Sequence, residues 1–459
     1  MLSTGKLGFW GLTALVFGLV IGVGIFNLPQ NLAVNAGPGC VFLAWLITGL
    51  GILPLVMVFK YLSERYPQYN AGLYQYAQAG FGNYVGFNIA WGYWLCSAFS
   101  NVAYAIMFND TLGAFIPVLH NHGWETILFG SVFIWLMFFI VSRGVRTAKF
   151  VNNLLSLVKI VMLIFIIVVF IMFFDIGLFS VDIWGKGLNI GNVGAQISHT
   201  MMITLFCFFG VEGAVMMSAR ARRSKDVGRA GVVGFLISVL LYLAVSLLCF
   251  GLMSQAELSG LKDPSIAYIL RHTCGEWSYW FVISAMIIAL LGGWVAWTLV
   301  VAQVPYEASL VGILPKCFSR VNRHNMPAFG LMASSIAMEF FMLLVVFADD
   351  MYLAALQVTG LMILPCYLFT GLFMLKVADS RATRALGLVT FIFCCWMIYA
   401  GGFYDFLLTS GFYLLGLPFF YMARKEKGTT TKIISNRNDK ICLGILILFA
   451  IAGCWILLN

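Results

Sequence analysis

The sequence predicts an all-α protein that crosses a membrane many times and has a core of two oppositely oriented repeats. Composition is the first reason: 62% of the 459 residues are hydrophobic and only 10% are charged, whereas soluble domains carry about 25% charged residues. Second, the apolar residues gather in segments of the roughly 20 residues that a membrane-spanning helix needs. Third, two of these segments contain paired glycines near their middle.

Thirteen apolar segments are expected to be membrane spans, and they are numbered in chain order. Whether the thirteenth crosses completely is left open. The spans are 10–34, 39–60, 84–115, 125–142, 149–174, 195–218, 230–254, 277–305, 328–347, 351–375, 385–401, 404–422 and 441–458.

Span 1 is interrupted by Gly22-Val23-Gly24. Glycine in the interior of a helix lowers helix stability, so two glycines one residue apart suit a helix that breaks there. A break leaves backbone N–H and C=O groups without helical partners, and at membrane depth this is tolerated where they line a cavity. The break is therefore expected to form half of a substrate site.

Span 6 repeats the feature, with Gly210 and Gly213 on either side of Glu212. Its start lies five spans after that of span 1, and an odd number gives the second set the opposite orientation. Paired interrupted helices at corresponding positions are typical of inverted-repeat transporters. A plain channel or receptor bundle, with glycines serving close helix packing, is the alternative.

These breaks divide the chain into a transport core and an accessory part. The core is expected at 1–375, with a first repeat at 10–174 and a second at 195–375. The accessory C-terminal helices are then 376–459.

The basic residues fix the predicted orientation. If loops alternate between the two sides, all but four of the 27 Lys and Arg residues fall on the side of the N-terminus. The exceptions are Lys186, Lys262 and Arg271 on the other side, and Lys159 within span 5. Positive charge concentrates in cytoplasmic loops, so the N-terminus is expected in the cytoplasm.

Charged residues inside the spans are Lys159, Glu212 and Glu339. Each costs about 2.5–3.5 kcal/mol at a helix centre on insertion scales, so each needs a reason. Glu212 is expected to face a cationic substrate or take up a proton, or else to bond backbone freed by Gly213. Lys159 would place its ammonium among the carbonyls of the span 1 break, or else extend to the cytoplasmic interface. Glu339 has no assigned role.

Three aromatic residues are candidates for a cation pocket near Glu212. Tyr93 lies in span 3, Phe206 lies one turn before the break in span 6, and Trp294 follows two glycines in span 8. An aromatic face attracts a guanidinium by about 2 kcal/mol or more when both are desolvated. Core packing is the alternative for each.

Motifs for other chemistry do not occur in the sequence. It lacks the GxxxxGK[ST] signature of ATP-driven proteins, and its 11 cysteines form no CxxC pair. No cofactor, metal or enzyme activity is expected.

Several stretches carry a resemblance to a known family. They are the span 1 stretch 18–29, the segment Gly72-Leu-Tyr-Gln-Tyr76, the span 6 stretch 209–214 with Ser218-Ala-Arg-Ala after it, and Leu291-Gly-Gly-Trp294. In these residues the chain resembles the amino acid–polyamine–organocation superfamily and, within it, the bacterial basic amino acid/polyamine antiporters. The resemblance covers about residues 5–420.

The resemblance implies a LeuT-type fold of five plus five helices, with helices 1 and 6 discontinuous and two or three accessory helices. It also implies roles for individual residues. The backbone near Ile21, Val23, Gly24 and Gly210 would hold a substrate carboxylate, as helix N-termini do for anions. Asn101 would contact substrate, Trp294 would stack on its guanidinium, and Phe206 would be a gate. Tyr93, Glu212 and Tyr367 would form an inner gate, with Glu212 sensing protons. Lys159 would take the position of a bound cation.

This chain departs from the family at two of those positions. Val23 replaces a serine found between the glycines in some relatives, and Phe206 stands where the arginine/agmatine antiporters have tryptophan. In span 10, Gln357 and Thr359 are the polar candidates for substrate contact.

The function implied is import of arginine in exchange for agmatine or ornithine across a bacterial inner membrane. The sequence does not determine the oligomeric state, for which a homodimer is one candidate. A proton-coupled amino acid symporter of the same fold is the alternative. A channel or a nutrient-sensing receptor is a third class.

Overall fold

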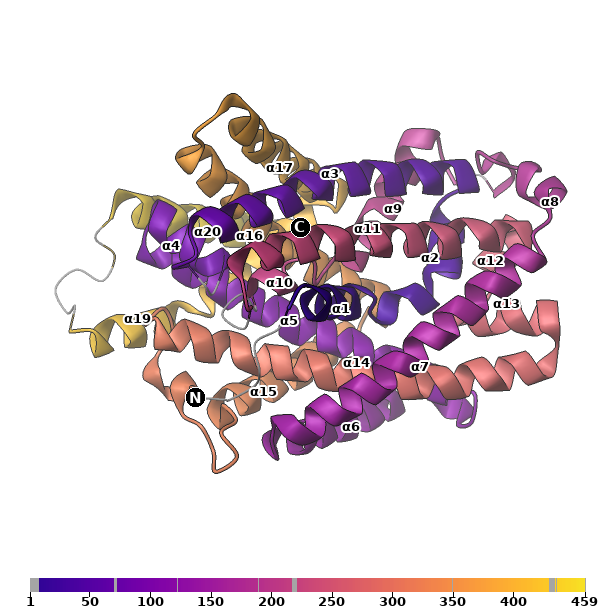
Figure 1. The fold of residues 1–459 in the computed structure, drawn as a ribbon, viewed down its shortest axis with the longest axis horizontal. Coiled ribbons are helices and arrows are strands. Elements are labelled where there is room, and N and C mark those ends of the chain that lie inside the picture. The colour runs from indigo at the N-terminus through magenta and orange to yellow at the C-terminus, as the bar shows by residue number, and fades with distance from the viewer. Residues whose placement is uncertain are drawn as a thin grey trace.

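The computed structural model describes residues 8–69, 72–121, 123–188, 190–216, 221–348, 350–428, 434 and 436–458. Helices and short turns make up nearly all of this part of the chain, which forms an elongated bundle (Figure 1). In the first half the elements are α1 (Phe9–Val20), η1 (Val23–Phe26), α2 (Leu28–Asn35), α3 (Pro38–Arg65), α4 (Leu73–Phe81), α5 (Asn83–Leu112), α6 (Trp124–Ser142) and α7 (Val145–Met172).

The second half continues with another set of long helices and short connecting ones. These are α8 (Ile176–Ser180), α9 (Val193–Cys207), α10 (Gly213–Met216), α11 (Ser224–Leu248), α12 (Gln255–Ser259), α13 (Ser265–Cys274), α14 (Glu276–Leu310), α15 (Ala328–Val345) and α16 (Met351–Val377). The accessory helices are α17 (Arg381–Ala400), α18 (Phe403–Leu414), α19 (Leu417–Glu426) and α20 (Arg437–Leu458).

Each of the thirteen predicted spans coincides with helix in its described part, with interruptions in spans 1, 6 and 12; residues 217 and 218 at the end of span 6 lie outside the described ranges. Within the described ranges, nine helices are long and apolar enough to cross a membrane, and three shorter apolar stretches, at 9–20, 158–172 and 193–207, accompany them. The nine do not include α5, although it has 30 residues and is buried along nearly its whole length. A helix surrounded by protein does not need a lipid-facing apolar surface, so hydropathy alone understates this central span.

Span 12 differs from the prediction of one continuous helix, because α18 ends at Leu414 and α19 begins at Leu417. Gly416 between them packs against Trp91, whose ring lies 2.9 Å from where a Cβ would be. Pro418 in the first turn of α19 then starts a new helix.

Helix packing follows the pattern expected of two equivalent halves. The helices of span 1 and span 6 touch, α3 packs on α11, α5 on α14, and α6 on α15. In addition, α16 packs on α5 just as α7 packs on α14. Corresponding spans therefore meet corresponding partners, while the exact repeat boundaries stay a prediction.

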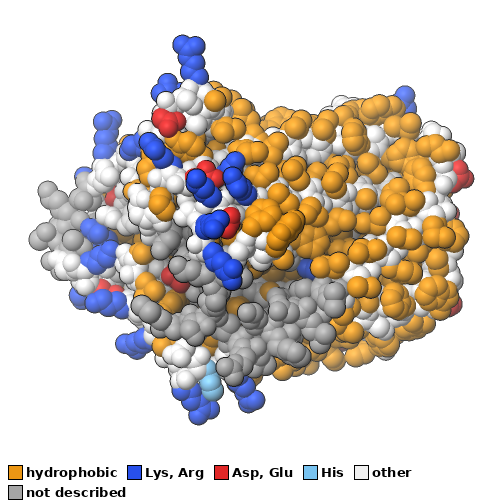
Figure 2. All heavy atoms as spheres, in the orientation of Figure 1, with side chains coloured by type: hydrophobic (Ala, Val, Ile, Leu, Met, Phe, Trp, Pro, Cys, Tyr) orange, Lys and Arg blue, Asp and Glu red, His pale blue; other side chains and the backbone are white. Residues whose placement is uncertain are grey.

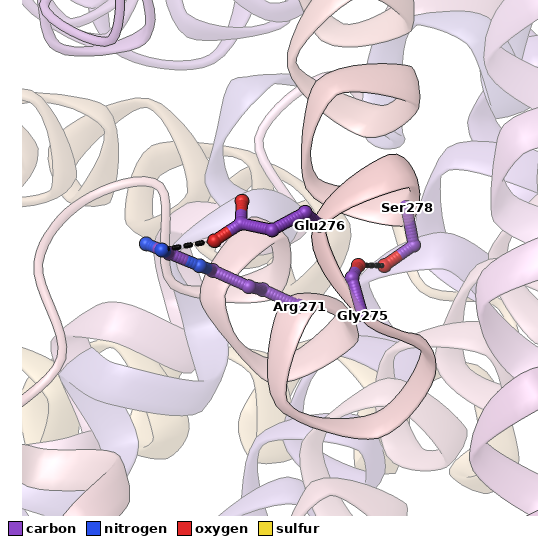
Figure 3. A network of polar contacts seen from close by, with 4 residues as sticks. All are labelled: Arg271, Gly275, Glu276 and Ser278. Atoms are coloured by element: carbon purple, nitrogen blue, oxygen red, sulfur yellow. Dashed lines mark hydrogen bonds and ion pairs between the residues drawn. The ribbon is translucent and has the colours of Figure 1, made fainter.

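Charge separates the two ends of the molecule. In Figure 2 the Lys and Arg side chains gather at the left end, where Figure 1 shows α4 and α19, and the rest of this face is largely apolar. At the opposite end a tight corner joins α13 to α14 (Figure 3). There Arg271 pairs with Glu276, and the Ser278 hydroxyl donates to the carbonyl of Gly275 at 2.7 Å. This corner fixes the start of span 8.

The C-terminal helix α20 is tied to the core. The carboxylate of Asp439 accepts hydrogen bonds from the backbone N–H groups of Tyr84 and Val85, at 2.9 and 3.4 Å. These groups lie in the first turn of α5, whose N–H groups have no partner within the helix. The helix that contains the thirteenth segment, α20, has 22 residues and is long enough to cross a bilayer.

Candidate functional site

The predicted break in span 1 is confirmed. Helix α1 ends at Val20, Ile21 leaves helical geometry with ψ of 80°, and a short 3-10 turn begins at Val23. The hydroxyl of Tyr242, from α11, donates to the freed carbonyl of Val20 at 2.7 Å. Part of the backbone at the break is thus satisfied by a neighbouring helix, as burial at membrane depth requires.

The predicted break in span 6 is confirmed as well, because α9 ends at Cys207 and α10 begins at Gly213. Gly210 between them has φ of +104°, and a Cβ there would lie 2.9 Å from the backbone carbonyl carbon of Leu19. Both the conformation and the close approach require glycine. The two interrupted helices therefore touch backbone to backbone.

The ammonium of Lys159 lies at the span 1 break. It donates to the carbonyl of Ile21 at 2.5 Å and to that of Gly18 at 3.1 Å, and the side chain is only 5% exposed. The lysine does not extend to the interface. The Lys159 side chain thus provides hydrogen-bond donors to carbonyls that would otherwise lack partners.

The carboxylate of Glu212 joins three spans. It accepts hydrogen bonds from the hydroxyl of Tyr93 at 2.9 Å, from that of Tyr367 at 2.8 Å, and from the N–H of Gly210 at 3.3 Å. Glu212 is fully buried. The structure brings together all three residues of the predicted inner gate, one each from spans 3, 6 and 10.

Two small cavities, each of about 20 Å³, flank the meeting point of the breaks. Gly22 and Gly24 line one of them, Gly210 lines the other, and Leu19 and Trp297 line both. A space of this size holds about one water molecule. The protein is therefore closed around the breaks, and an amino acid fits only after the elements that line the two cavities rearrange.

Phe206 closes one side of the site. A Cβ at Gly24 would lie 3.6 Å from its ring, so the ring covers the backbone of the span 1 break. Behind it, Phe209 stacks on Trp297 with ring centroids 4.8 Å apart. The predicted gating position thus lies directly over the predicted carboxylate-binding backbone.

Asn101 and Trp294 lie on facing helices beside the breaks. The amide oxygen of Asn101 accepts a hydrogen bond from Thr298 at 3.3 Å, and Thr298 also donates to the carbonyl of Trp294 at 2.8 Å. The Trp294 ring is fully buried near Phe108 and Phe133, with centroids 6.0 and 6.4 Å away. In this closed conformation Trp294 is packed among aromatic rings of α5 and α6 and lines neither cavity.

Two other predicted positions make contacts elsewhere. The amide of Gln357 donates to the carboxylate of Asp405 at 2.6 Å and to the carbonyl of Gly401 at 3.2 Å, so it faces the accessory helices. Glu339 accepts a hydrogen bond from Ser131 at 2.6 Å, which ties α15 to α6. Neither residue lines the cavities at the breaks.

Sequence reasoning missed Tyr104 and Trp297. A Cβ at Gly22 or at Gly293 would lie 3.1 or 3.0 Å from the Tyr104 hydroxyl, so this residue fills the space between spans 1 and 8. Helical spacing carried the signal, because Tyr104 and Trp297 each follow a predicted site residue by three positions and so share its face.

Acidic side chains lie beyond the site, toward the end with few basic residues. Burial raises the pKa of Asp263, and the nearby carboxyls of Asp110 and Asp350 raise it further. The backbone around Asp263 is held to the span 1 break, since the Ser265 hydroxyl donates to the carbonyl of Phe26 at 3.3 Å. A raised pKa favours the neutral form of the carboxyl, so Asp263 is a protonatable group held beside the span 1 break.

Comparison with known proteins identifies the family. The model of the amino acid permease family matches residues 7–448. Proteins called arginine/agmatine antiporter are 37% identical in Chlamydia trachomatis serovar L2 and 36% in Chlamydia abortus, with 99% of this chain and 97% of each relative covered. A putative amino-acid transporter of Clostridium perfringens is 35% identical, with 98% and 97% covered.

A solved structure supports the fold. A Na⁺-coupled sialic acid symporter in a substrate-bound, outward-open state matches with a TM-score of 0.55 and 14% identity, over 87% of this chain and 90% of the symporter. The architecture is the LeuT-type fold that the resemblance implied, with its discontinuous helices at the breaks in spans 1 and 6. The chain is a multi-pass membrane protein that belongs to the amino acid permease family.

Proposed function

We propose that this protein is an antiporter that imports arginine and exports agmatine, and that it is a transporter rather than an enzyme. The observation that carries the proposal is the pair of touching breaks, closed by Phe206 on one side and by the Glu212 carboxylate with its two tyrosines on the other. Relatives similar over the full chain are called arginine/agmatine antiporters. Ornithine is the alternative export product.

The chemistry of the site suits a cationic amino acid. Backbone N–H groups at a broken helix attract a carboxylate, and aromatic rings beside Glu212 favour a guanidinium. Agmatine lacks the carboxylate, so the cationic end would provide the recognition that both substrates share.

The proposed exchange moves net charge across the membrane. Arginine enters with one net positive charge, and agmatine leaves with two. Each cycle removes one positive charge from the cell, the equivalent of one proton. The proposal places the protein in a bacterial inner membrane with its basic end, including the N-terminus, in the cytoplasm.

Lys159 favours exchange over sodium coupling. Its ammonium occupies the carbonyls of Gly18 and Ile21, a place where a sodium ion would otherwise find oxygen ligands. The ammonium group there supplies the hydrogen bonds that these carbonyls need without an ion.

Uptake into proteoliposomes tests the proposal. Radiolabelled arginine is offered to vesicles loaded with nothing, arginine, ornithine or agmatine. Uptake confined to loaded vesicles supports obligatory exchange, and the best internal amine identifies the partner. Uptake into empty vesicles with a proton gradient rejects the antiporter.

A proton-coupled symporter is the second candidate, because two buried titratable groups, Lys159 and Glu212, lie at the breaks. Either would serve as a proton carrier across the cycle. Proton-driven uptake into empty vesicles, lost in Glu212→Gln or Lys159→Met, is the result this candidate requires.

A further inference from the structure

A large cavity separates the transport core from the accessory helices. Its volume is about 550 Å³, far larger than the cavities at the breaks, and its walls come from α4, α5, α16, α17, α18 and α20. Cavities of roughly 300–1,000 Å³ are typical of ligand sites. The proposed transport cycle assigns nothing to this space.

The walls of the cavity are mainly apolar. Phe81, Leu368, Phe406, Ile445 and Phe449 are typical of its walls. Three of its hydroxyl groups are already used within the protein: Thr409 donates to the carbonyl of Phe406 at 2.7 Å, Ser410 to that of Leu407 at 2.5 Å, and Tyr413 to that of Met362 at 2.8 Å. Apart from the amide oxygen of Asn88, which has no hydrogen-bond partner among the described residues, the wall therefore suits an apolar chain.

The cavity opens on the surface that faces lipid. Tyr399, Phe403 and Ile445, which line it, are 70%, 52% and 44% exposed. Along α20 it extends from Asn438 to Phe449, a rise of about 16 Å at 1.5 Å per residue. This matches one leaflet of a hydrocarbon core about 30 Å thick.

One end of the cavity carries positive charge. Arg437 and Lys440, both exposed, flank Asn438 in the first turn of α20. The ammonium of Lys376 lies 5.7 Å from the ring centroid of Phe81, a wall residue, and donates to the carbonyl of Gly80 at 2.6 Å. The acidic residue of this turn, Asp439, is turned away and bonded to backbone N–H groups of α5.

We propose that the cavity is a binding site for a phospholipid with an anionic headgroup, from the leaflet on the basic side of the protein. One acyl chain fills the cavity, and the phosphate lies among Lys376, Arg437 and Lys440. Length, apolar walls and charge complementarity together select this occupant. The site also touches the transport machinery, because the wall residues Pro365 and Leu368 lie on either side of Tyr367 in α16.

Native mass spectrometry of the purified full-length protein tests the site. The probes are palmitoyl-oleoyl phosphatidylglycerol, phosphatidylcholine with the same chains, and oleic acid. The wild type is expected to bind phosphatidylglycerol about tenfold more tightly than phosphatidylcholine. Equal binding of the two phospholipids, or oleic acid binding as tightly as phosphatidylglycerol, would overturn the proposal.

Two pairs of variants locate the site. Ile445→Trp fills the cavity and is expected to weaken phosphatidylglycerol binding about tenfold. Leu448→Trp, on the same helix but outside the cavity walls, is expected to leave binding unchanged. Lys376→Gln with Arg437→Gln should reduce phosphatidylglycerol binding to the phosphatidylcholine level, unlike Arg381→Gln with Arg384→Gln in α17.

The control for folding is the thermal unfolding temperature of each variant. If Ile445→Trp unfolds, the Lys376→Gln and Arg437→Gln pair decides the matter by itself. If Ile445→Trp binds like Leu448→Trp, the cavity is not the acyl site. If the wild type is a dimer that Ile445→Trp dissociates, a second copy of the chain covers the cavity and the proposal fails.

Discussion

The ammonium of Lys159 donates a hydrogen bond to the carbonyl oxygen of Ile21 at 2.5 Å, at the residue where span 1 stops being helical. A side chain from span 5 thereby completes the backbone of span 1. The same ammonium holds the carbonyl of Gly18 one turn earlier.

Lys159→Met is expected to destabilise the protein. It leaves the carbonyls of Gly18 and Ile21 without their donor, at about 1–3 kcal/mol for each unsatisfied buried group. The measurement is the thermal unfolding temperature in detergent, with Lys225→Met, an exposed lysine at the start of α11, as the control. Equal unfolding temperatures for the two variants would show that the Lys159 contacts contribute nothing.

Glu212→Gln is expected to flatten the pH dependence of exchange. When the Glu212 carboxylate takes up a proton, its charge-assisted hydrogen bonds from Tyr93 and Tyr367 weaken, which frees spans 3 and 10 from span 6. Glutamine fixes the neutral form, so exchange rates in proteoliposomes between about pH 5 and 8 should vary less than in the wild type.

The matched control is Glu339→Gln, since Glu339 also lies inside a span but bonds Ser131 away from the breaks. It is expected to keep the wild-type pH profile. A Glu212→Gln profile parallel to that of the wild type would remove Glu212 from the sensor role.

Gly210→Ala is expected to abolish transport or folding. The backbone has φ of +104°, and the new Cβ would meet the backbone of Leu19 at 2.9 Å, which no side-chain rotation relieves. Strain and overpacking together cost roughly 2–6 kcal/mol. Gly411→Ala, where no atom lies within 4 Å of the new Cβ, is the control for expression and unfolding temperature. Normal exchange by Gly210→Ala would mean that the breaks do not touch as described.

Trp294→Leu is expected to raise the KM for arginine more than that for citrulline, a neutral analogue of similar shape. A desolvated cation–π contact of about 2 kcal/mol corresponds to roughly 30-fold in binding. Initial rates of exchange for both substrates give the comparison. Trp297→Leu, which removes a wall shared by both cavities, should weaken both substrates alike. If Trp294→Leu also weakens the binding of both substrates alike, the role of Trp294 is limited to packing.

The sequence predicted the breaks because the effect of glycine on helix stability depends on the local backbone alone. Gly22, Gly24, Gly210 and Gly213 each fall where helical geometry ends or resumes. Hydropathy likewise placed all thirteen helical segments. Both signals depend on a residue and its neighbours in the chain, so no tertiary information was needed.

Tertiary contacts decided what the sequence left open. The choice between interface and break for Lys159 depends on how span 5 packs beside span 1, and the direction of Gln357 depends on Asp405, 48 residues later. Hydropathy also does not show that α5 lies at the centre of the bundle, because a high hydropathy is needed only where a helix faces lipid. Residue type alone could not separate Trp294 from Trp297.

The backbone contact between Leu19 and Gly210 has a mechanical consequence. With no side chain between them, the two half-helices have nothing compressible at their junction, and close-packed contacts transmit displacement rather than absorb it. Spans 1 and 6 therefore behave as a single lever, in which a tilt that widens one mouth narrows the other. A leak, in which the site opens to both sides of the membrane at once and the solute gradients are lost, is therefore disfavoured by the close contact at Gly210.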